Sequence, residues 1–327
     1  MRTLQIIEYL VGTIDTGSLF HLGGRTIGAI NYLKGGHFFM SHKLALLALS
    51  LLSLGMASCG PTPTSNPGGI EVNKLIVGLE CDYAPFNWTE ISSNDFTLPI
   101  ANVSGQYADG YDVQIAKKLS QELQIPVEIY KEDWEALIPD LQTNTINVVI
   151  AGMTDTEERR ESIAFTNEYY RSELVLIVKK EVADSNPGVL NQDQLTTLLT
   201  GKGLLSQVST VTNDVIDIFK DKCGAIHYDP QQTFALAALD VSNGSAFAMT
   251  AEYPVAQSIV ASNSSLGILH LDQTILGDSL AELGVSIGIH KNHPKLQEAL
   301  NVALNKISQD ERNDLMVAAV SRSTEGE

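Results

Sequence analysis

Short runs of apolar residues alternate along the chain with longer segments in which apolar positions recur every three or four residues. The first four runs are typical of buried strands and lie at residues 75–79, 127–130, 146–150 and 174–178. Helical spacing occupies residues 113–123 and 134–142, and the capping-box spacing of Thr154 and Glu157 predicts a third helix beginning at residue 154. This alternation predicts an α/β protein with parallel sheets covered by helices.

The same alternation continues after residue 178. We expect strands at residues 204–208, 246–249 and 285–289, and helices at 213–219, 231–239, 294–308 and 310–320. The chain has 327 residues, of which 44% are hydrophobic, so it can form two domains with cores of ordinary size.

The chain is strongly acidic. It carries 21 Lys and Arg against 39 Asp and Glu, a formal charge of −18, which would repel a polyanion. We therefore predict no binding to nucleic acid. An acidic surface also keeps a protein soluble, so the charge alone does not identify a cationic ligand.

The cysteines and histidines do not form a metal-binding pattern. Cys59, Cys81 and Cys223 are far apart, and the seven histidines are scattered. His290 and His293 could share a helix face, but no carboxylate or cysteine joins them, so two solvated loop histidines are favoured. We predict neither a metal nor a cofactor.

A leader is expected near the start of the chain. A short basic segment from Met40 is followed by an apolar stretch, residues 44–57, that is too short for a membrane span of about 20 residues. This is typical of a signal peptide at 40–58, and Ala57 and Ser58 before Cys59 resemble a bacterial lipobox. Ordinary cleavage near Ala57 and a buried apolar helix are the alternatives.

Lipidation of Cys59 would place the mature protein on the outer face of a bacterial membrane, or in the periplasm, held by lipid alone. Residues 60–69 have no apolar side chain to bury and are rich in proline and glycine, and we expect a mobile tether at 59–70. Residues 1–39 precede an apparently complete signal peptide, so we expect an upstream extension or a mis-assigned start, with a long leader as the alternative.

Several motifs occur in a specific order. They are Gly78–Phe86 (GLECDYAPF), Gly110–Val113 (GYDV), Trp134 with Leu137–Pro139, Ala151–Arg159 (AGMTDTEER), Phe165–Thr166, Tyr169–Tyr170, Glu252–Ala256 and Val285–Gly288. Over residues 72–320 this order resembles the polar amino acid family of ABC-transporter solute-binding proteins.

The resemblance implies the two-lobed periplasmic-binding-protein fold of type II, with a ligand cleft between lobes joined by two hinge strands. We expect lobe 1 at residues 71–178 plus 283–327 and lobe 2 at 179–282. The function implied is extracellular capture of a free amino acid and its delivery to the permease subunits of an ABC importer, and we expect a monomer.

A free amino acid carries a carboxylate and an ammonium, and each needs a partner when it is desolvated. Arg159 is the expected carboxylate partner, because a guanidinium binds a carboxylate bidentately near a helix start. By resemblance, Thr154 adds a hydroxyl, and Ala151 and Gly152 belong to the same ligand-binding segment. The alternative for Arg159 is a surface pair with a neighbouring glutamate.

The resemblance also implies that Glu252 receives the ligand ammonium and that Tyr83 and Trp134 form aromatic walls. Glu252 could instead be a helix-start carboxylate, and both aromatic residues could belong to the core. Ser209 and Thr210 are expected to cap the next helix and reach the ligand carboxylate, although Val208 departs from the family's Gly-Thr pattern.

Glu80 bears on the choice of substrate. Its family position faces the ligand and is often acidic in proteins that bind basic or polar amino acids. We therefore favour arginine or lysine, while glutamine or an aromatic amino acid would also suit a cleft lined by Trp and Tyr. An enzyme on the same fold, or a sensor or adhesin ectodomain, remains an alternative function, although no catalytic constellation is visible.

Overall fold

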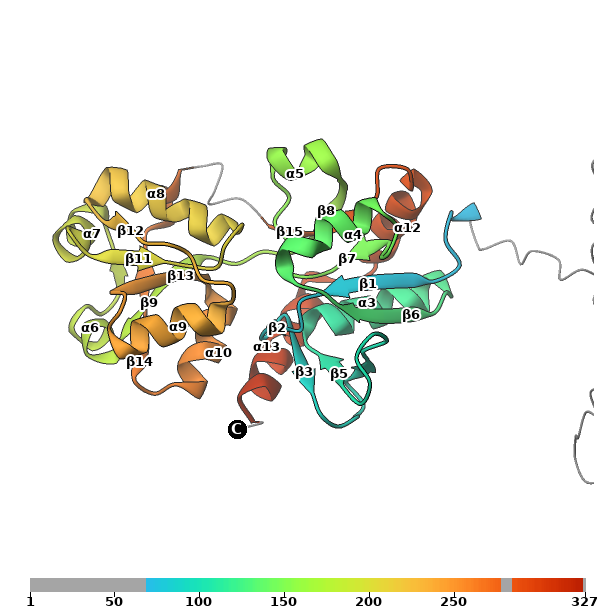
Figure 1. Ribbon diagram of the computed structural model, residues 1–327, viewed down its shortest axis with the longest axis horizontal. Helices are drawn as coiled ribbons and strands as arrows, with labels where there is room; N and C mark the ends of the chain where they lie inside the picture. The colour runs from blue at the N-terminus through green and yellow to red at the C-terminus, as the bar shows by residue number, and fades with distance from the viewer. Residues whose placement is uncertain (1–68, 278–283, 326–327) are drawn as a thin grey trace, which may run out of the picture. The chain divides into compact units, whose positions relative to one another are not determined.

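Two large sheets organise the chain, as a computed structural model shows for residues 69–277 and 284–325 (Figure 1). We call the first sheet with its helices lobe 1 and the second sheet with its helices lobe 2. The expected extension at 1–39, the signal peptide at 40–58, the lipidation site Cys59 and nearly all of the tether lie outside the described residues.

Lobe 1 is built on a five-stranded sheet. In spatial order its strands are β6 (Val127–Lys131), β1 (Leu75–Leu79), β7 (Val148–Val149), β15 (Val285–Ile289) and β8 (Ala164–Tyr170). β15 comes late in the chain but pairs with β7 on one side and with β8 on the other. The chain therefore returns to lobe 1 after it has formed lobe 2.

Lobe 2 is built on a six-stranded sheet. In spatial order its strands are β10 (Val189–Leu190), β14 (Leu266–Leu271), β9 (Leu174–Lys179), β13 (Ala248–Glu252), β11 (Gly203–Leu205) and β12 (Ile226–His227). The expected end of lobe 1 at residue 178 is wrong, because β9 hydrogen-bonds to β13 and β14 of the second sheet. The chain enters lobe 2 between β8 and β9.

The prediction of parallel sheets holds for only part of each sheet: β1, β6 and β7 are parallel in lobe 1, as are β11, β12 and β13 in lobe 2. β15 runs antiparallel to both of its neighbours in lobe 1, and β9 does the same in lobe 2. Each of these two strands comes directly after the chain has passed from one lobe to the other. Their direction is therefore not determined by the helical crossover connections that make neighbouring strands parallel.

A small antiparallel sheet in lobe 1 was missed by the sequence pattern. Its order is β2 (Asp82–Tyr83), β3 (Asn87–Glu90), β5 (Tyr107–Asp109) and β4 (Leu98–Pro99). These strands are short and half-exposed, so they lack the apolar runs that mark the buried strands.

Helices cover both faces of the first sheet. They are α3 (Tyr111–Leu123), the 3₁₀ turn η2 (Trp134–Ala136), α4 (Leu137–Gln142), α5 (Glu157–Ser162), α12 (Pro294–Leu304) and α13 (Gln309–Glu325). Val77 and Val148 pack in the cluster that contains the apolar faces of α3 and α12, whereas Ile76 and Val149 pack with Leu137 of α4. The strands alternate between the two faces, which makes a three-layered lobe.

Lobe 2 has the same three-layered construction. Its helices are α6 (Lys180–Ser185), α7 (Gln192–Leu199), α8 (Val211–Cys223), α9 (Phe234–Asn243), α10 (Tyr253–Ser262) and the 3₁₀ turn η3 (Gln273–Leu276). Leu176 and Val178 of β9 pack in the cluster that contains α7 and α8, while Val175 and Ile177 pack with residues of α9 and α10. In Figure 1, α7 and α8 lie on one side of this sheet and α9 and α10 on the other.

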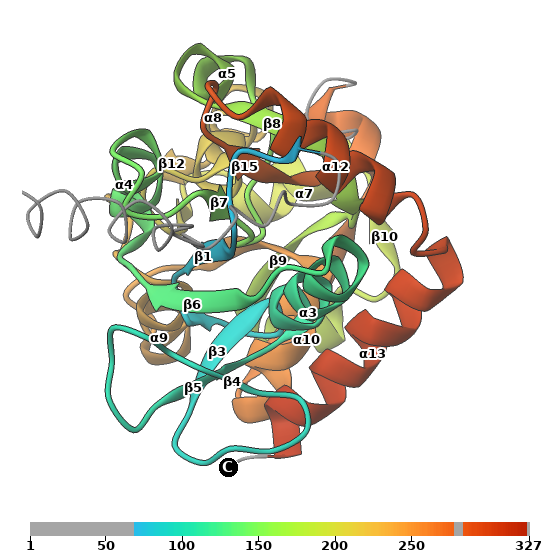
Figure 2. The same ribbon diagram turned by 90° about the vertical axis from the view of Figure 1, so that its right-hand side faces the viewer.

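The last helix contacts both lobes. α13 lies beside α3 of lobe 1 and α10 of lobe 2 (Figure 2). Arg322 fixes it to lobe 1 through a bidentate ion pair with Asp109, at 2.9 and 3.0 Å. The hydroxyls of Ser323 and Ser258 lie 2.8 Å apart and link α13 to α10.

None of the helices in the part of the chain that the structure describes is long and apolar enough to cross a membrane.

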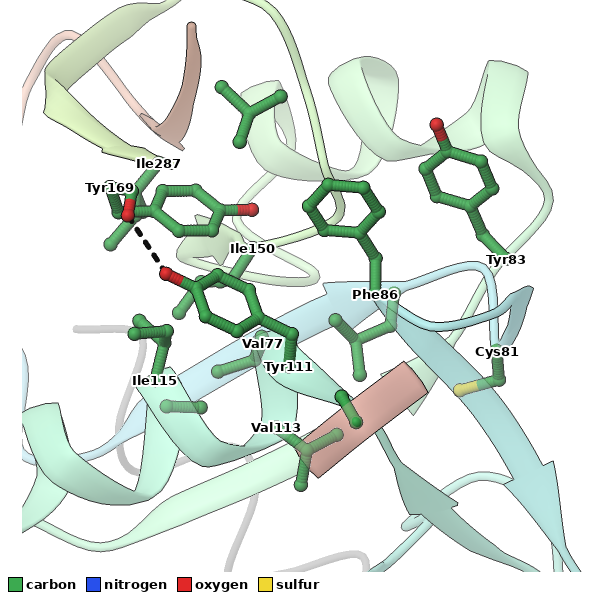
Figure 3. Packing of buried hydrophobic residues seen from close by; sticks show 14 of the residues in the cluster. Val77, Cys81, Tyr83, Phe86, Tyr111, Val113, Ile115, Ile150, Tyr169 and Ile287 are labelled. Atoms are coloured by element: carbon green, nitrogen blue, oxygen red, sulfur yellow. Dashed lines mark hydrogen bonds between the residues drawn. The ribbon is translucent and has the colours of Figure 1, made fainter. Parts of the chain in front are cut away.

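Aromatic residues fill the centre of lobe 1. The rings of Tyr111 and Tyr169 stack with centroids 5.9 Å apart, and the Tyr111 hydroxyl donates to the Tyr169 carbonyl oxygen at 2.9 Å (Figure 3). α3 enters this region at Gly110, where a Cβ atom would lie 2.2 Å from the Phe86 carbonyl oxygen. Only glycine permits this close approach.

Candidate functional site between the lobes

The loop after β1 supplies the first two predicted site residues. Glu80 and Tyr83 are only 7% and 5% exposed. Between them, Cys81 has a φ of +55°, an unusual conformation for a residue with a side chain. The turn leaves Asp82 exposed while Glu80 and Tyr83 both line a cavity.

The segment after β7 supplies Arg159. α5 begins at Glu157, and its N-cap is Thr156, whose hydroxyl accepts from the Arg159 amide at 3.2 Å. The predicted helix start at Thr154 is wrong, because Thr154 forms a β-bridge with Val285. Arg159 is thus the third residue of a short helix, and its Nη1 reaches back to the Thr154 carbonyl oxygen at 2.8 Å.

Lobe 2 contributes the turn that precedes α8. Thr210 caps this helix as predicted, since its hydroxyl accepts from the Asn213 amide at 3.2 Å. The same hydroxyl donates to the Gln207 carbonyl oxygen at 2.7 Å, so it is already occupied. Ser209 has a φ of +57°, and its carbonyl oxygen, rather than its hydroxyl, points towards Arg159.

Glu252 ends β13 and occupies the N-cap position of α10. Its side chain makes no capping hydrogen bond and instead accepts one from the Tyr83 hydroxyl of lobe 1. Burial raises the pKa of Glu252, and the hydrogen bond from Tyr83 opposes this effect. The carboxylate is therefore directed across the cleft and away from its own helix.

These side chains meet around a cavity whose empty space, with the adjoining open solvent included, is about 310 Å³. It is lined by Glu80, Tyr83, Trp134, Gly152, Thr154, Arg159, Gln207, Thr210, Val211, Thr212, Phe234 and Glu252. All of the predicted site residues except Ala151 and Ser209 are in this set. Ala151 is buried in the core beneath α4, and Ser209 borders a neighbouring depression. Ligand contact itself stays a prediction for every one of them.

Several direct contacts join the two lobes across this cavity. The Gln207 amide donates to Glu80 Oε1 at 2.6 Å. The Ser209 carbonyl oxygen accepts from Trp134 Nε1 and from Arg159 Nη2, each at 3.0 Å. The arrangement is therefore closed around the cavity.

Arg159 is the main positive charge at the cavity. Two of its five N–H groups donate to backbone carbonyl oxygens, and its guanidinium lies 5.4 Å from the centre of the Trp134 ring. Among the described residues, no carboxylate oxygen lies within 4.0 Å of its nitrogens. Arg159 therefore does not form the surface pair with a neighbouring glutamate that was its alternative role. The adjacent Arg160 does form a surface ion pair, with its Nε 2.6 Å from Oδ1 of Asp155.

Glu80 carries an unusual ionisation equilibrium. Burial raises the pKa of Glu80 from 4.5 to about 7, with Asp82 and Asp133 adding to the effect. The hydrogen bond from Gln207 and the charge of Lys131 act in the opposite direction on this pKa. A cation placed in the cavity would favour the ionised form.

Four cavity-lining residues were not predicted as site residues, namely Gln207, Val211, Thr212 and Phe234. Phe234 is the first residue of α9, and its ring centroid lies 4.7 Å from that of Tyr83. Val211 and Thr212 are the first two residues of α8. All of these follow a strand of the second sheet, and such positions border ligands in α/β proteins. That rule could have found them.

Within residues 69–277 and 284–325, no group of three or more His, Cys, Asp or Glu side chains is arranged to hold a metal ion. Cys81 and Cys223 are both buried and unpaired by disulfides. The charged and aromatic groups that line the cavity are the Arg159 guanidinium, the Glu80 and Glu252 carboxylates and the rings of Tyr83, Trp134 and Phe234.

Residues 75–318 match the profile of the bacterial extracellular solute-binding proteins, family 3. The chain belongs to this family. The arginine-binding extracellular protein of Bacillus subtilis is 28% identical over 142 residues, which cover 43% of this chain and 49% of that protein. The ABC transporter arginine-binding protein 1 of Escherichia coli is 24% identical over 74% of this chain and 88% of its own length.

Solved structures share the fold. An amino acid ABC transporter substrate-binding protein of Streptococcus pneumoniae bound to L-arginine has a TM-score of 0.61 at 22% identity, covering 77% of this chain and 96% of that one. A reconstructed ancestral amino acid-binding protein, described as a precursor of cyclohexadienyl dehydratase, has a TM-score of 0.58 at 23% identity. The two-lobed type II architecture is therefore common to all of them.

Proposed function

We propose that this family 3 protein captures one free amino acid between its lobes and delivers it to an ABC importer. The observation that carries the proposal is the guanidinium of Arg159, which lines the cavity without a carboxylate partner among the described residues. A half-buried charge of this kind is costly unless a ligand pairs with it.

A zwitterion fits the distribution of charge. Arg159 has three N–H groups left for an α-carboxylate, and a guanidinium can bind it bidentately. Glu252 lies across the cavity and can accept from an α-ammonium group. Tyr83, Phe234 and Trp134 provide apolar walls for the remainder of the ligand.

Glu80 favours a cationic side chain. After Arg159 has paired with the ligand carboxylate and Glu252 with its ammonium, Glu80 is a second carboxylate at the cavity, and it forms no ion pair with a Lys or Arg side chain among the described residues. A guanidinium or ammonium on the ligand side chain would neutralise it. The relatives named for arginine agree with this reasoning, and we propose arginine or lysine as the substrate, ahead of glutamine.

Capture would operate through closure. The bonds from Gln207 to Glu80 and from Trp134 to the Ser209 carbonyl exist only when the lobes are together. A ligand held by both lobes adds contacts to the closed form alone and so shifts the equilibrium towards it. The importer would recognise that form.

The remaining parts of the proposal concern the setting of this activity. We propose that the protein acts as a monomer and a binder rather than an enzyme, anchored outside the cell by lipid on Cys59. A family of extracellular solute-binding proteins supports the location. Loss of membrane association in a Cys59→Ser variant expressed from Met40 tests the anchor, and continued membrane association would contradict it.

A thermal-shift screen of the common amino acids tests the function directly, because a ligand that binds only the native state raises its stability by about 2.7 kcal/mol at a concentration of 100 Kd. We expect L-arginine or L-lysine to give the largest shift. Agmatine lacks the carboxylate that Arg159 would bind, and Nα-acetyl-L-arginine lacks the ammonium for Glu252, so neither should stabilise the protein comparably. The proposal fails if no amino acid raises the melting temperature.

A further inference from the structure

One carboxylate lies behind the cavity rather than on it. Asp112, in the first turn of α3, is fully buried and is absent from the cavity lining. Its Oδ1 accepts from the Tyr169 hydroxyl at 2.7 Å, and its Oδ2 accepts from the Asn87 amide at 2.9 Å. It belongs to the Gly110–Val113 motif, to which the proposed capture assigns no part.

The hydrogen bond between Asp112 and Tyr169 is linked to one wall of the cavity. The Tyr169 hydroxyl accepts from the Gly152 amide at 2.9 Å. Gly152 lines the cavity with a φ of +62°, and a Cβ atom there would lie 2.9 Å from the Tyr83 ring. Figure 3 shows Tyr169 in the core beside Tyr111, the residue that precedes Asp112. Asp112 thus holds Gly152 in place through Tyr169, and a hydrogen bond from the Gly152 amide also lowers the pKa of Asp112.

The hydrogen bond between Asp112 and Asn87 is linked to the turn that carries Glu80 and Tyr83. Asn87 is fully buried, and its Oδ1 accepts from the Cys81 amide at 2.7 Å. Cys81 is the residue with a φ of +55° that lies between Glu80 and Tyr83. Asp112 therefore also holds the turn that directs two cavity-lining side chains.

No compensating cation accompanies this carboxylate. Within the described residues, no Lys or Arg side chain forms an ion pair with Asp112. Burial raises the pKa of Asp112 well above its usual range, although the hydrogen bonds from Tyr169 and Asn87 counteract this. An apolar residue at this position would avoid the free-energy cost of burying a carboxyl group. The hydrogen bonds of Asp112 must therefore have a role that apolar packing could not fulfil.

The directions of these hydrogen bonds show which role the side chain at position 112 has. The amides of Cys81 and Gly152 can only donate, so Asn87 must present its oxygen to Cys81 and its NH₂ group to residue 112. Tyr169 accepts from Gly152 and has one hydrogen left for residue 112. Residue 112 must therefore accept at two atoms, which the two oxygens of an aspartate can do and the single oxygen of an asparagine of the same size cannot.

We infer that Asp112 is a positioning residue of the ligand site, which fixes both the Glu80–Tyr83 turn and Gly152 through Asn87 and Tyr169. This inference rests on the proposed function, because its readout is the affinity for an amino acid. Networks of this kind keep ligand-contacting groups in their productive geometry.

The decisive substitution is Asp112→Asn. The amide has the same size but only one acceptor, so either the Asn87 bond or the Tyr169 bond is lost. We expect the Kd for L-arginine, measured by calorimetry, to rise by about tenfold or more, as for other buried donors left unpaired. An unchanged Kd would overturn the inference.

The double variant D112N/N87D separates direction from volume. The amide at position 112 can donate to the carboxylate at 87 and accept from Tyr169, while that carboxylate still accepts from the Cys81 amide. Recovery of the affinity to within about threefold of the original supports the inference, and failure to recover overturns it. If D112N does not fold, Tyr169→Phe, which removes one bond to Asp112, takes its place with the same expected loss of affinity.

Asn147 provides a matched control. It is buried in the same lobe, accepts from the Ile76 amide at 2.8 Å and donates to the Lys74 carbonyl oxygen at 3.0 Å, without lining the cavity. Asn147→Asp also mismatches one buried hydrogen bond, so it should lower stability and leave the Kd unchanged. A loss of affinity equal to that of D112N would show that destabilisation alone explains the effect.

Amide hydrogen exchange of the ligand-free protein distinguishes this inference from the proposed function. In D112N we expect faster exchange at Cys81 or Gly152, by about tenfold or more, with Ile76 unchanged. Failure of every amino acid to bind the original protein would reject the capture proposal, while this exchange result would still decide the role of Asp112. Equal exchange in both proteins would overturn it.

Discussion

The pKa of Glu80 makes ligand binding and protein stability depend on pH in opposite ways. Burial raises this pKa from 4.5 to about 7 in the ligand-free protein. A cationic ligand needs the ionised form of Glu80, so below pH 7 binding must first remove a proton. We therefore predict that the Kd for L-arginine increases as the pH falls from 8 to 6.

The size of the effect follows from the fraction of Glu80 that is ionised. About nine-tenths of the carboxyl group is ionised at pH 8 and about one-tenth at pH 6, so the Kd should be about tenfold weaker at pH 6. About half a proton should be released per ligand bound at pH 7. Glu252 also has a raised pKa and acts in the same direction, which makes the Glu80→Gln variant necessary as a control.

The same shift has a consequence for folding. Between pH 4.5 and 7 the folded protein binds more protons at Glu80 than the unfolded chain does, so stability falls as the pH rises through this window. Above pH 7 the loss approaches about 3 kcal/mol. Glu80→Gln should therefore raise the free energy of unfolding of the ligand-free protein at pH 8 and leave it unchanged at pH 4.

Calorimetry at pH 6, 7 and 8, in two buffers with different ionisation enthalpies, measures both the Kd and the protons released. Urea denaturation at pH 4 and pH 8 measures the stability. The reasoning is refuted if the Kd for L-arginine is the same at pH 6 and 8, or if its full pH dependence persists in Glu80→Gln.

Three further predictions concern other parts of the molecule. Arg159→Ala should weaken amino acid binding by about 2–5 kcal/mol, the range for truncating one partner of a buried charge pair, and near-unchanged affinity by calorimetry would reject the site. Gly152→Ala should lower stability by about 1–3 kcal/mol and weaken binding, because φ is +62° and the new Cβ would press on Tyr83, and an unaltered melting temperature would contradict this. Arg322→Ala leaves the Asp109 carboxylate, 2% exposed, unpaired, so denaturation should show a loss of about 3–5 kcal/mol while calorimetry shows an unchanged Kd.

The sequence predicted the strands that are buried, because burial leaves a local apolar run. It could not assign β9 to its sheet. Leu174–Lys179 is apolar in the way that a central strand of either lobe would be, and its partners β13 and β14 are about 70 to 100 residues away. Hydrogen-bond partners at such distances leave no local signal.

The candidate site was predicted through motif order, and the geometry of individual residues was not. Ser209 was chosen for its hydroxyl, but a φ of +57° turns its carbonyl oxygen towards Trp134 and Arg159. Gln207 was not predicted as a site residue, yet its side-chain amide donates directly to Glu80. Backbone conformation and contacts across the cleft depend on the assembled structure.

The position of β15 sets the order in which the molecule can be completed during synthesis. The second sheet needs only residues up to Leu271, all of them contiguous from β9 onwards. In the first sheet, β7 and β8 have no shared neighbour until Val285–Ile289 has emerged. Lobe 2 can therefore fold while lobe 1, although its chain begins earlier, is still incomplete. In a nascent chain at that stage, the edges of β7 and β8 that later pair with β15 are open. Such edges are prone to aggregation or to binding by a chaperone.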